Sequence, residues 1–379
     1  MFLVGAGPDG MKQIRFLETE YPYAEFSTVV SPALERAVEE RKAPSTAVLN
    51  SFPQDSITLG YFEDPEKCLD LEYCRLAGIQ VRRRRNTGGS ILGGKGSAFL
   101  VLCLDVLQDW VCMRSLEEGF RCSLSAMAEA MRELWGLDAR WRPLNDVEVG
   151  GRKLVASSAR LEKDVLTLRL VINAARVEPS LLKNAMKIPP EKMKDNQSQD
   201  PAQRVSSLEQ ELGRSLGKEE ILALARRSIG KMFGGDVILS PGELNALEKR
   251  YAKEFEKTLS SKEWFWGRSE ALKSASLSCP CWRVDGLHKA PAGLIRVTLW
   301  VKERTIQDLL ITGDFHARPL QLVEELEAGL RGALADLEVI ASRILPLLER
   351  PGVELPGVSR EDLLAPFHQA LRKLASRQG

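Results

Sequence analysis

Histidine is nearly absent from this chain of 379 residues. Its three histidines are His288, His316 and His368, so the first 287 residues contain none. A Ser/His/Asp or Cys/His mechanism needs an imidazole as its base, and we therefore expect none within the N-terminal three quarters. Chemistry there must use lysine, arginine, carboxylates and backbone N–H groups. A carboxylate nucleophile suits that inventory because it is already ionised at neutral pH.

An excess of one charge and long apolar runs are also lacking. The chain carries 53 basic and 52 acidic residues, and its formal net charge is +1. Such a balance predicts no chain-wide field for nucleic acid or membrane, so any basic site must be local. No apolar run approaches the roughly 18 residues that span a bilayer, and there is no early signal segment. We expect a cytoplasmic protein with neither nucleic acid nor membrane as a partner.

The cysteines follow no regular spacing. They are Cys68, Cys74, Cys103, Cys112, Cys122, Cys279 and Cys281. An odd, irregular set in a long chain is not typical of a disulfide framework. Hydrophobic residues make up 44% of the chain, which is enough for one large core and a smaller second domain.

What the chain does contain is a basic, glycine-rich junction, RRRRNTGGSIL, which begins at Arg82. Arginines beside a flexible glycine turn can cradle a phosphate, and they can also be a solvated strand end. We interpret Arg84 and Arg85 as the pair that grips a ligand. Arg82 and Arg83 are expected to face solvent or a partner protein.

A second informative stretch runs from Asn145 to Asn173. It predicts an antiparallel meander with strands at Asp146–Val149, Arg152–Leu161 and Val165–Ile172 and a two-residue turn at Gly150-Gly151. The middle strand contains the residues ASSA, which have almost no side chain. Small residues on a strand indicate close packing, or a ligand that lies against the backbone.

The remaining elements are a mixture of helices and strands. Helices are expected at 31–42, 72–78, 123–137, 217–233, 240–259, 318–350 and 359–375, and Ser240 is the expected N-cap of the fifth. Strands are expected at 46–52 and 56–62, on either side of a turn, and at 79–84 and 97–106. Two more strands are expected between 293 and 314. Residues 195–203 are expected to form an exposed loop. SSKEWFWGRSEA is interpreted as a hinge between two domains, so the predicted fold class is α+β.

Five segments in order resemble lipoate–protein ligases, which belong to the biotin/lipoate ligase superfamily. They are RRRRNTGGSIL, NDVEVGGRKLVASSA, RVSSLEQ, EWFWG and IQDLLITGDF. The resemblance runs from about residue 31 to about residue 334. It implies a large domain with a mixed or antiparallel sheet that binds an acyl-adenylate, expected at 1–267. A small C-terminal α+β accessory domain with terminal helices is expected at 268–379.

The resemblance also implies a reaction. Lipoate would be activated with ATP and Mg²⁺ to lipoyl-AMP, and the lipoyl group would pass to a lysine of a lipoyl carrier domain. That carrier would be a dehydrogenase-complex acyltransferase subunit or a glycine-cleavage H-type protein. Lys153 would be the catalytic residue and would lie against the mixed-anhydride oxygens. The implied ligand-binding residues are Arg84, Arg85, Thr87, Gly88, Gly89, Ser90, Asn145, Asp146 and Ala156, with Asp146 also a Mg²⁺ contact.

The chain departs from the family pattern at several positions. Ser90 and Ala156 each replace a glycine, while Gly94 and the pair Leu168-Arg169 stand where family histidines are usual. Several alternatives therefore stay open: a lipoyl or octanoyl transferase without ATP activation, a ligase for an unusual acyl group, a biotin ligase, or a non-catalytic paralogue that binds acyl groups or carriers. Transfer through a cysteine thioester needs a thiol, and no cysteine lies between Cys122 and Cys279.

Overall fold

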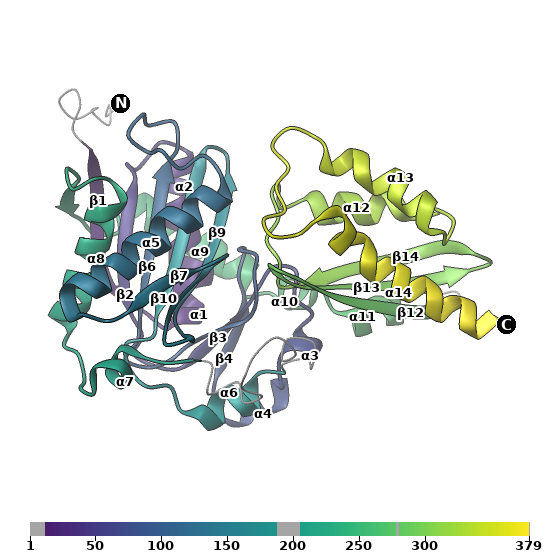
Figure 1. Ribbon diagram of the computed structural model, residues 1–379, viewed down its shortest axis with the longest axis horizontal. Helices are drawn as coiled ribbons and strands as arrows, with labels where there is room; N and C mark the ends of the chain where they lie inside the picture. The colour runs from purple at the N-terminus through teal and green to yellow at the C-terminus, as the bar shows by residue number, and fades with distance from the viewer. Residues whose placement is uncertain (1–11, 188–204, 278–279, 379) are drawn as a thin grey trace.

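The computed structural model describes residues 12–187, 205–277 and 280–378. Figure 1 shows a large lobe that contains the N-terminal part of the chain and a smaller C-terminal lobe beside it. Strands and helices mix in both lobes, so the predicted α+β class is confirmed. The loop expected at 195–203 lies outside the described residues.

An eight-stranded sheet forms the centre of the large lobe, in the order β11-β1-β2-β6-β10-β9-β8-β7. Its strands are β1 (Gln13–Glu20), β2 (Thr46–Ser51), β6 (Ala98–Asp105), β7 (Ala139–Arg142), β8 (Asp146–Val149), β9 (Arg152–Glu162), β10 (Val165–Ile172) and β11 (Ile238–Pro241). β11, β1 and β2 run parallel, and every other neighbouring pair is antiparallel. The predicted meander is confirmed as β8, β9 and β10.

Helices cover both faces of this sheet. One face carries α5 (Leu116–Trp135) and α8 (Lys218–Met232), and the other carries α1 (Tyr23–Glu25), η1 (Phe26–Val30), α2 (Ser31–Glu39) and α9 (Ala246–Leu259). Strand side chains alternate between the two cores: Leu100 and Leu102 of β6 pack with α5, while Val101 and Cys103 pack with α2. This burial on both faces explains why β6 is a continuous apolar run.

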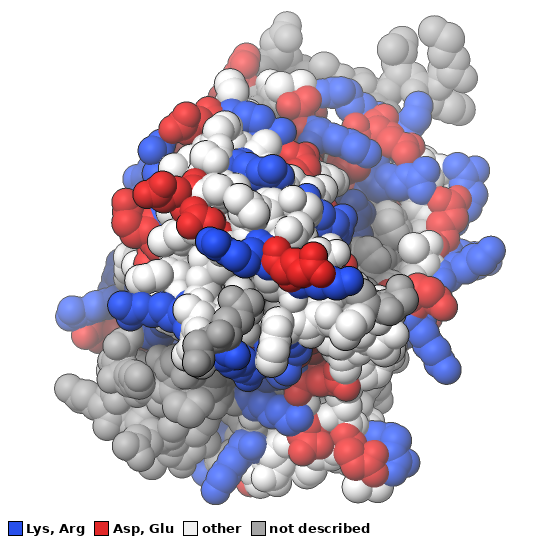
Figure 2. Space-filling view, turned by 90° about the vertical axis from the view of Figure 1, so that its right-hand side faces the viewer, with Lys and Arg blue, Asp and Glu red and all other residues white. Residues whose placement is uncertain are grey.

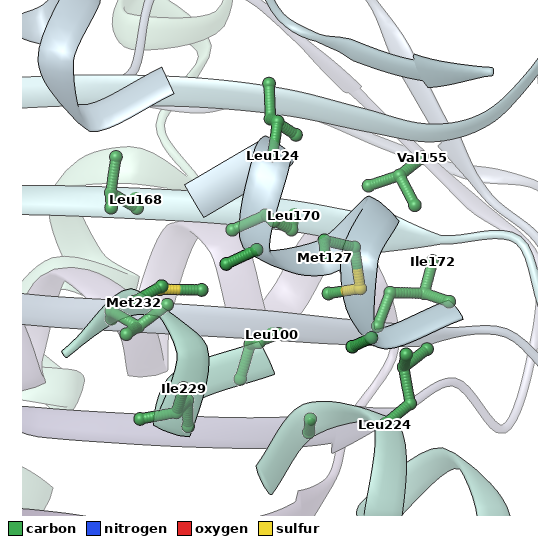
Figure 3. Close-up of a cluster of buried hydrophobic side chains, with 14 of the residues drawn as sticks. Leu100, Leu124, Met127, Val155, Leu168, Leu170, Ile172, Leu224, Ile229 and Met232 are labelled. Atoms are coloured by element: carbon green, nitrogen blue, oxygen red, sulfur yellow. The ribbon is translucent and has the colours of Figure 1, made fainter. Parts of the chain in front are cut away.

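The core under α5 is built from long aliphatic side chains. Figure 3 shows Leu124 and Met127 of α5 and Ile229 of α8 gathered over Leu100 and Leu170 of the sheet. All five are 0% exposed. The faces differ in what they bury, because the α2 face also holds charged and hydroxyl side chains.

Several expected helix boundaries are wrong, and the stretch expected as one helix at 318–350 forms two, Leu322–Leu330 and Leu337–Leu348. Ser240 is not an N-cap but a residue of the edge strand β11, and α9 begins later, after a capping box of Asn245 and Glu248. Asn245 and Glu248 satisfy each other's backbone N–H groups, which starts the helix at that point. The helix expected from residue 123 begins at Leu116, because the Ser115 side chain caps the N–H of Glu118.

A second, three-stranded sheet has the order β4-β3-β5. It consists of β3 (Ser56–Leu59), β4 (Gln80–Arg83) and β5 (Ile91–Gly93), and α3 (Pro65–Cys68), α4 (Leu71–Leu76), α6 (Pro179–Ala185) and α7 (Leu208–Leu212) complete the large lobe. The strands at 46–52 and 56–62 were expected around one turn, but β2 and β3 join different sheets. The chain between them therefore connects two sheets and does not close a hairpin.

The C-terminal lobe has its own antiparallel sheet and core. It contains β12 (Trp282–Ala290), β13 (Gly293–Lys302), β14 (Thr305–Gly313), α12 (Leu322–Leu330), α13 (Leu337–Leu348) and α14 (Arg360–Gln378), and α10 (Lys262–Trp266) and α11 (Glu270–Ser276) lead into it. β12 has no counterpart among the expected strands. Phe62 of the large lobe joins this core and stacks on Phe315, with ring centres 5.2 Å apart. The boundary expected at 267–268 falls between α10 and α11.

The surface of the C-terminal side carries both signs of charge. Figure 2 shows Lys and Arg side chains interspersed with Asp and Glu over this face. Ion pairs within the C-terminal lobe include Arg318–Glu354 and Arg360–Glu349. Within the described ranges, every helix is too short or too polar to cross a membrane.

The tightly packed core predicts a specific cost for Leu170→Ala. The side chain is fully buried among α5, α8 and the sheet, so its truncation leaves a cavity. We expect the free energy of unfolding to fall by about 2–5 kcal/mol in urea denaturation. Leu107→Ala is the control, since Leu107 is 57% exposed and its loss should change little. Equal effects of the two variants would contradict this description of the core.

Candidate active site

The β8–β9 hairpin brings Asp146 and Lys153 together. Gly150 and Gly151 turn the chain with φ of +56° and +75°, which suits a two-residue hairpin. The Lys153 Nζ lies 2.8 Å from the Asp146 Oδ2. The Lys153 side chain is 33% exposed, whereas the Asp146 side chain is 10% exposed. The Lys153 ammonium is therefore partly accessible to solvent, while its partner Asp146 is nearly buried.

One oxygen of Asp146 is left over. Its Oδ1 is buried and has no hydrogen-bond partner within the described ranges. A buried carboxylate oxygen normally has a donor or a cation beside it. No group of three or more metal-ligating side chains occurs in the described residues, so a cation at Asp146 would need ligands from a substrate. Mg²⁺ is often bound in that way, through one or two carboxylates and phosphate oxygens.

Asn145 holds the two strands together. Its Nδ2 donates to the Ser157 carbonyl oxygen at 3.1 Å, and its own carbonyl accepts from the Ser157 N–H at 3.0 Å and from the hydroxyl at 2.8 Å. Ala156, which precedes Ser157 on β9, lies opposite Asp146 of β8 and is partly exposed. This register puts Ala156 beside Asp146, with only a methyl group as its side chain.

Arg84 organises the glycine turn from within. It is 1% exposed and donates to the carbonyl oxygens of Thr87 and Gly89 at 2.9 and 2.8 Å, and to the Thr58 hydroxyl at 3.0 Å. Burial lowers the pKa of its guanidinium. The Ser90 hydroxyl extends the set by donating to Glu63 at 2.7 Å. The Arg84 Nη2 thus shapes the turn, while Nη1 binds Thr58 of β3.

Arg85 has a different environment. Its guanidinium carbon lies 5.3 Å from the centre of the Phe255 ring, within the range of a cation–π contact. Burial lowers the pKa of Arg85, and the neighbouring Arg160 acts in the same direction while Glu35 and Glu39 oppose it. Unlike Arg84, Arg85 remains partly exposed.

The expectation for Arg82 and Arg83 is wrong. Arg83 is 2% exposed and donates to the carbonyl oxygens of Phe265, Gly60, Tyr61 and Glu63. Arg82 forms an ion pair with Glu256 at 2.8 Å. The reason is that α10 packs on β4 and Glu256 of α9 reaches Arg82, so both arginines bind within the protein instead of facing solvent or a partner protein.

The C-terminal lobe contacts the glycine turn directly. The Gly88 N–H donates to the Phe315 carbonyl oxygen at 3.2 Å, and the Thr87 hydroxyl lies 2.9 Å from the His316 Nδ1. Gly88 has a φ of +88°, and a Cβ added there would lie 2.9 Å from the His316 ring. Only glycine fits this conformation and this contact. The Gly88 N–H, one of those expected to bind phosphate, is thus occupied by the docked lobe.

His316 lies against the glycine turn, and sequence reasoning missed it. The histidine-free N-terminal three quarters excluded an imidazole from the site, but the fold returns one from a distant segment. The only sequence signal was its position directly after IQDLLITGDF. The ring is 1% exposed, and its Nε2 has no partner in the part of the chain that the structure describes. Burial, together with the charge of Arg84, lowers the His316 pKa to about 4.

This burial predicts a pH dependence of stability. Between pH 6.5 and about 4 the unfolded chain protonates at His316 while the folded chain does not, so the free energy of unfolding falls as the pH drops through that window. The full loss is on the order of 3 kcal/mol. Chemical denaturation at pH 7.5 and pH 4.5 measures it.

His316→Gln should remove this part of the pH dependence, because glutamine can still bond to Thr87 but does not titrate. His368→Gln is the matched control, since His368 is exposed and lies in the same lobe. An unchanged pH profile in His316→Gln would show that protonation of this ring does not oppose folding.

Four of the described cysteines are poor candidates for a thiolate nucleophile. Cys103 is on the α2 face of the sheet but is fully buried, and burial with the nearby Glu35 raises its pKa to about 12. Cys122 packs on the opposite, α5 face, and burial raises its pKa to about 11. Cys74 lies in the core of the small sheet, and Cys281 is disulfide-bonded.

Solved structures share this fold. The lipoate complex of LipL1 from P. falciparum matches with a TM-score of 0.67 and 13% identity, over 96% of this chain and 99% of that one. A bipartite lipoate protein ligase from Thermoplasma acidophilum, described with its E2 lipoyl domain, matches with a TM-score of 0.57 and 22% identity, over 68% of this chain and 97% of that one. The fold is therefore that of lipoate ligases.

The sequence identifies the family. Residues 29–229 match the lipoyl protein ligase A/B catalytic domain, which is more than half of the chain. The chain belongs to this family of enzymes. The matched stretch includes the glycine turn and the whole meander with Asp146 and Lys153.

Curated relatives include both transferases and ligases. Octanoyltransferase LipM from Geobacillus kaustophilus is 25% identical over 67% of this chain and 98% of its own length. Lipoate-protein ligase A subunit 1 from Thermoplasma acidophilum is 25% identical over 58% of this chain and 84% of its length. Subunit 2 of that ligase is 43% identical over 84 residues, which are 22% of this chain and 82% of its length.

Proposed function

We propose that this enzyme is an ATP-dependent lipoate–protein ligase. It activates lipoate to lipoyl-AMP and transfers the lipoyl group to a lysine of a lipoyl carrier domain. The observation that carries the proposal is the Lys153–Asp146 pair, with a lysine ammonium at 2.8 Å and a second, unpartnered carboxylate oxygen among the described residues. In this pair, the lysine ammonium would contact the acyl oxygens, and the Asp146 carboxylate would hold a metal ion that is bound to the phosphates.

The first step suits these residues. A lipoate carboxylate oxygen forms a bond to the α-phosphorus of ATP, and pyrophosphate leaves. The carboxylate is ionised at neutral pH, so no base is needed. Asp146 would hold Mg²⁺ through its free Oδ1, and the metal would supply charge neutralisation of the phosphates. The guanidinium of Arg85 supports binding of the same phosphates, because it is partly exposed and its described contact is with the Phe255 ring.

The second step suits Lys153. The carrier amine attacks the acyl carbon, negative charge grows on the carbonyl oxygen, and AMP then leaves as the amide forms. An ammonium held near that oxygen stabilises the charge without reorganisation. Ala156 beside the pair leaves room for the anhydride, since it brings no long side chain to this edge.

The second candidate is an octanoyl transferase that uses a cysteine thioester, and the match to LipM favours it. A thioester needs a thiolate nucleophile. The pKa of the Cys103 thiol is raised to about 12 by burial, which opposes that role, and the β8–β9–β10 meander contains no cysteine. The match to both subunits of a lipoate-protein ligase further supports ligation.

A lipoyl carrier domain is the proposed partner. The T. acidophilum ligase of the same fold is described together with its E2 lipoyl domain. The acceptor for this enzyme would be the corresponding lysine of a dehydrogenase-complex acyltransferase subunit or of a glycine-cleavage H-type protein. The mixed charges of the C-terminal face favour neither carrier.

Pyrophosphate exchange tests the activation step. The protein is incubated with lipoate, ATP, Mg²⁺ and labelled pyrophosphate in the absence of carrier. We expect lipoate-dependent incorporation of the label into ATP, because adenylation is reversible before transfer. Addition of a carrier should then raise the carrier mass by one lipoyl group. Transfer from synthetic lipoyl-AMP, or from an octanoylated carrier, without any exchange would contradict ATP activation.

Lys153→Ala should reduce lipoyl transfer roughly 10²–10³-fold, the usual loss for one preorganised donor. The side chain is partly exposed, so its removal creates no core cavity and the variant should fold. Lys153→Arg should also be poor, because a planar guanidinium does not replace a compact ammonium.

Arg152→Ala is the matched control for Lys153→Ala. It removes the neighbouring charge on the same strand, where Arg152 is exposed and pairs with Glu211. Its transfer rate should stay close to that of the unmodified enzyme. A parental rate in Lys153→Ala would remove Lys153 from the mechanism.

A further inference from the structure

The edge of the large sheet carries an arginine beside Asp146. β7 is the last strand of this sheet, and Arg142, at its end, lies directly opposite Asp146 of β8. On the other side of β8, Ala156 of β9 lies opposite the same aspartate. Opposite residues on neighbouring antiparallel strands share a face, with their Cβ atoms about 5 Å apart. Arg142, Asp146 and Ala156 therefore form one row, with the aspartate in the middle.

The side chains on the opposite face show which way this row points. Ala139, Trp141 and Val147 all pack into the core under α5. Successive side chains of a strand point to opposite faces, so Arg142 and Asp146 point away from α5. The Arg142 side chain is 50% exposed. Its guanidinium is therefore accessible to a ligand, next to a carboxylate that is nearly buried.

The hairpin that joins the two residues is fixed by hydrogen bonds. Only residues 143–145 separate Arg142 from Asp146 along the chain. The Trp141 Nε1 donates to the Leu144 carbonyl oxygen at 3.1 Å, and the Asn145 side chain donates to a carbonyl oxygen of β9. The backbone thus sets the position of the arginine relative to the aspartate, as a preorganised binding site requires.

The described partner of Arg142 is easily replaced. Its Nη1 donates to the Glu148 Oε1 at 3.1 Å. An ion pair with a half-exposed arginine contributes little to stability, because solvent screens it. A phosphate group can instead accept two parallel hydrogen bonds from one guanidinium, which is the stronger arrangement. A ligand that carries phosphates can therefore displace Glu148 from Arg142 at little cost.

Other phosphate donors that the sequence suggested are engaged within the protein. Arg84 donates to the glycine turn, and the Gly88 N–H donates to Phe315. Arg85 lies over the Phe255 ring of α9, whereas Arg142 belongs to the opposite strand edge of the site. The unpartnered Oδ1 of Asp146 among the described residues is suited to a metal ion that phosphates share. Arg142 is the cation next to that carboxylate on β7.

We propose that Arg142 binds the pyrophosphate portion of ATP, as its magnesium complex, and stabilises it as the leaving group. The inference rests on the proposed function for the reaction. As the carboxylate oxygen bonds to the α-phosphorus, the bond from this phosphorus to the bridging oxygen breaks, and its electron pair stays on pyrophosphate. No proton moves in this step. A guanidinium held beside the departing oxygens offsets the charge that they gain.

Binding of inorganic pyrophosphate to the full chain tests the site without turnover. Calorimetric titrations are made with Mg²⁺ and with the metal chelated. We expect binding only with Mg²⁺, because Asp146 and Glu148 repel the free anion. Arg142→Ala should weaken binding roughly 10- to 100-fold, the range for a hydrogen bond between charged groups, and Arg142→Lys should restore part of it. Absence of binding by the parental chain with Mg²⁺ would overturn the inference.

Kinetics separate the pyrophosphate site from the carrier site. Arg142→Ala should raise the KM for pyrophosphate in the exchange reaction at least tenfold. Transfer from synthetic lipoyl-AMP, which contains no pyrophosphate, should keep the parental rate. Parental exchange with slowed transfer would assign Arg142 to carrier binding and reject the inference. If the parental chain shows no exchange but binds magnesium pyrophosphate through Arg142, ATP activation is rejected and the pyrophosphate site stands.

Arg140→Ala is the matched control. Arg140 lies two residues before Arg142 on the same face of β7, and its side chain is 76% exposed. Its Nε and Nη2 both donate to Asp138 at 3.0 Å. Both variants remove one positive charge, but Arg140→Ala should bind magnesium pyrophosphate with close to the parental affinity. Equal losses in the two variants would show a general effect of charge, and Arg142 would then not form a specific site.

Discussion

The site depends on the hydrogen bonds that the buried guanidinium of Arg84 donates. It collects the carbonyl oxygens of Thr87 and Gly89 and so imposes a shape on a glycine turn that has little structure of its own. The shaped turn presents Gly88 to Phe315 and Thr87 to His316. Loss of this guanidinium would leave buried carbonyl oxygens of the turn unpaired. The contacts of the turn with the C-terminal lobe therefore depend on Arg84.

The meander supplies the second fixed element. Gly150 and Gly151 close β8 onto β9, and the register irregularity at Val147 and Glu148 lets Lys153 reach back to Asp146. Antiparallel neighbours on both sides hold the pair in position. The site therefore combines a rigid strand edge with a turn that is contacted by the other lobe. This arrangement is consistent with the proposed two-step reaction, in which nucleotide and carrier must reach the same carbonyl group.

The two faces of the large sheet bury different kinds of side chains. The α5 face is a conventional apolar core, as Figure 3 shows. The α2 face buries Glu35, Arg160 and Arg169 beside apolar side chains. Charges of this kind cost free energy unless they are paired, and here Glu35 lies beside both Arg160 and Arg169, while Glu39 also pairs with Arg160. The same face adjoins the Lys153–Asp146 pair.

Local sequence determined much of the chain. The alternation and turns of residues 145–173, the continuous apolar run of β6 and the cap of α14 are short-range signals, so these elements were predicted nearly to the residue. Ser240 was misjudged because Asn245 and Glu248 offer a competing capping box a few residues later. β12 was missed, and β2 and β3 were expected around one turn although they belong to different sheets, because pairing partners are set by distant strands.

The residues of the candidate site also fall into those placed by local sequence and those placed by the tertiary structure. The hairpin that carries Asp146 and Lys153 follows from the local pattern of strands and glycines, whereas the role of these residues and of the glycine turn is what the resemblance to lipoate–protein ligases implies. Only the tertiary structure decided that Arg83 is buried under α10, that Arg84 bonds to the turn itself, and that His316 returns an imidazole to a histidine-free domain. The physical reason is that burial and hydrogen bonding depend on which distant surfaces meet, and a linear pattern does not contain that information.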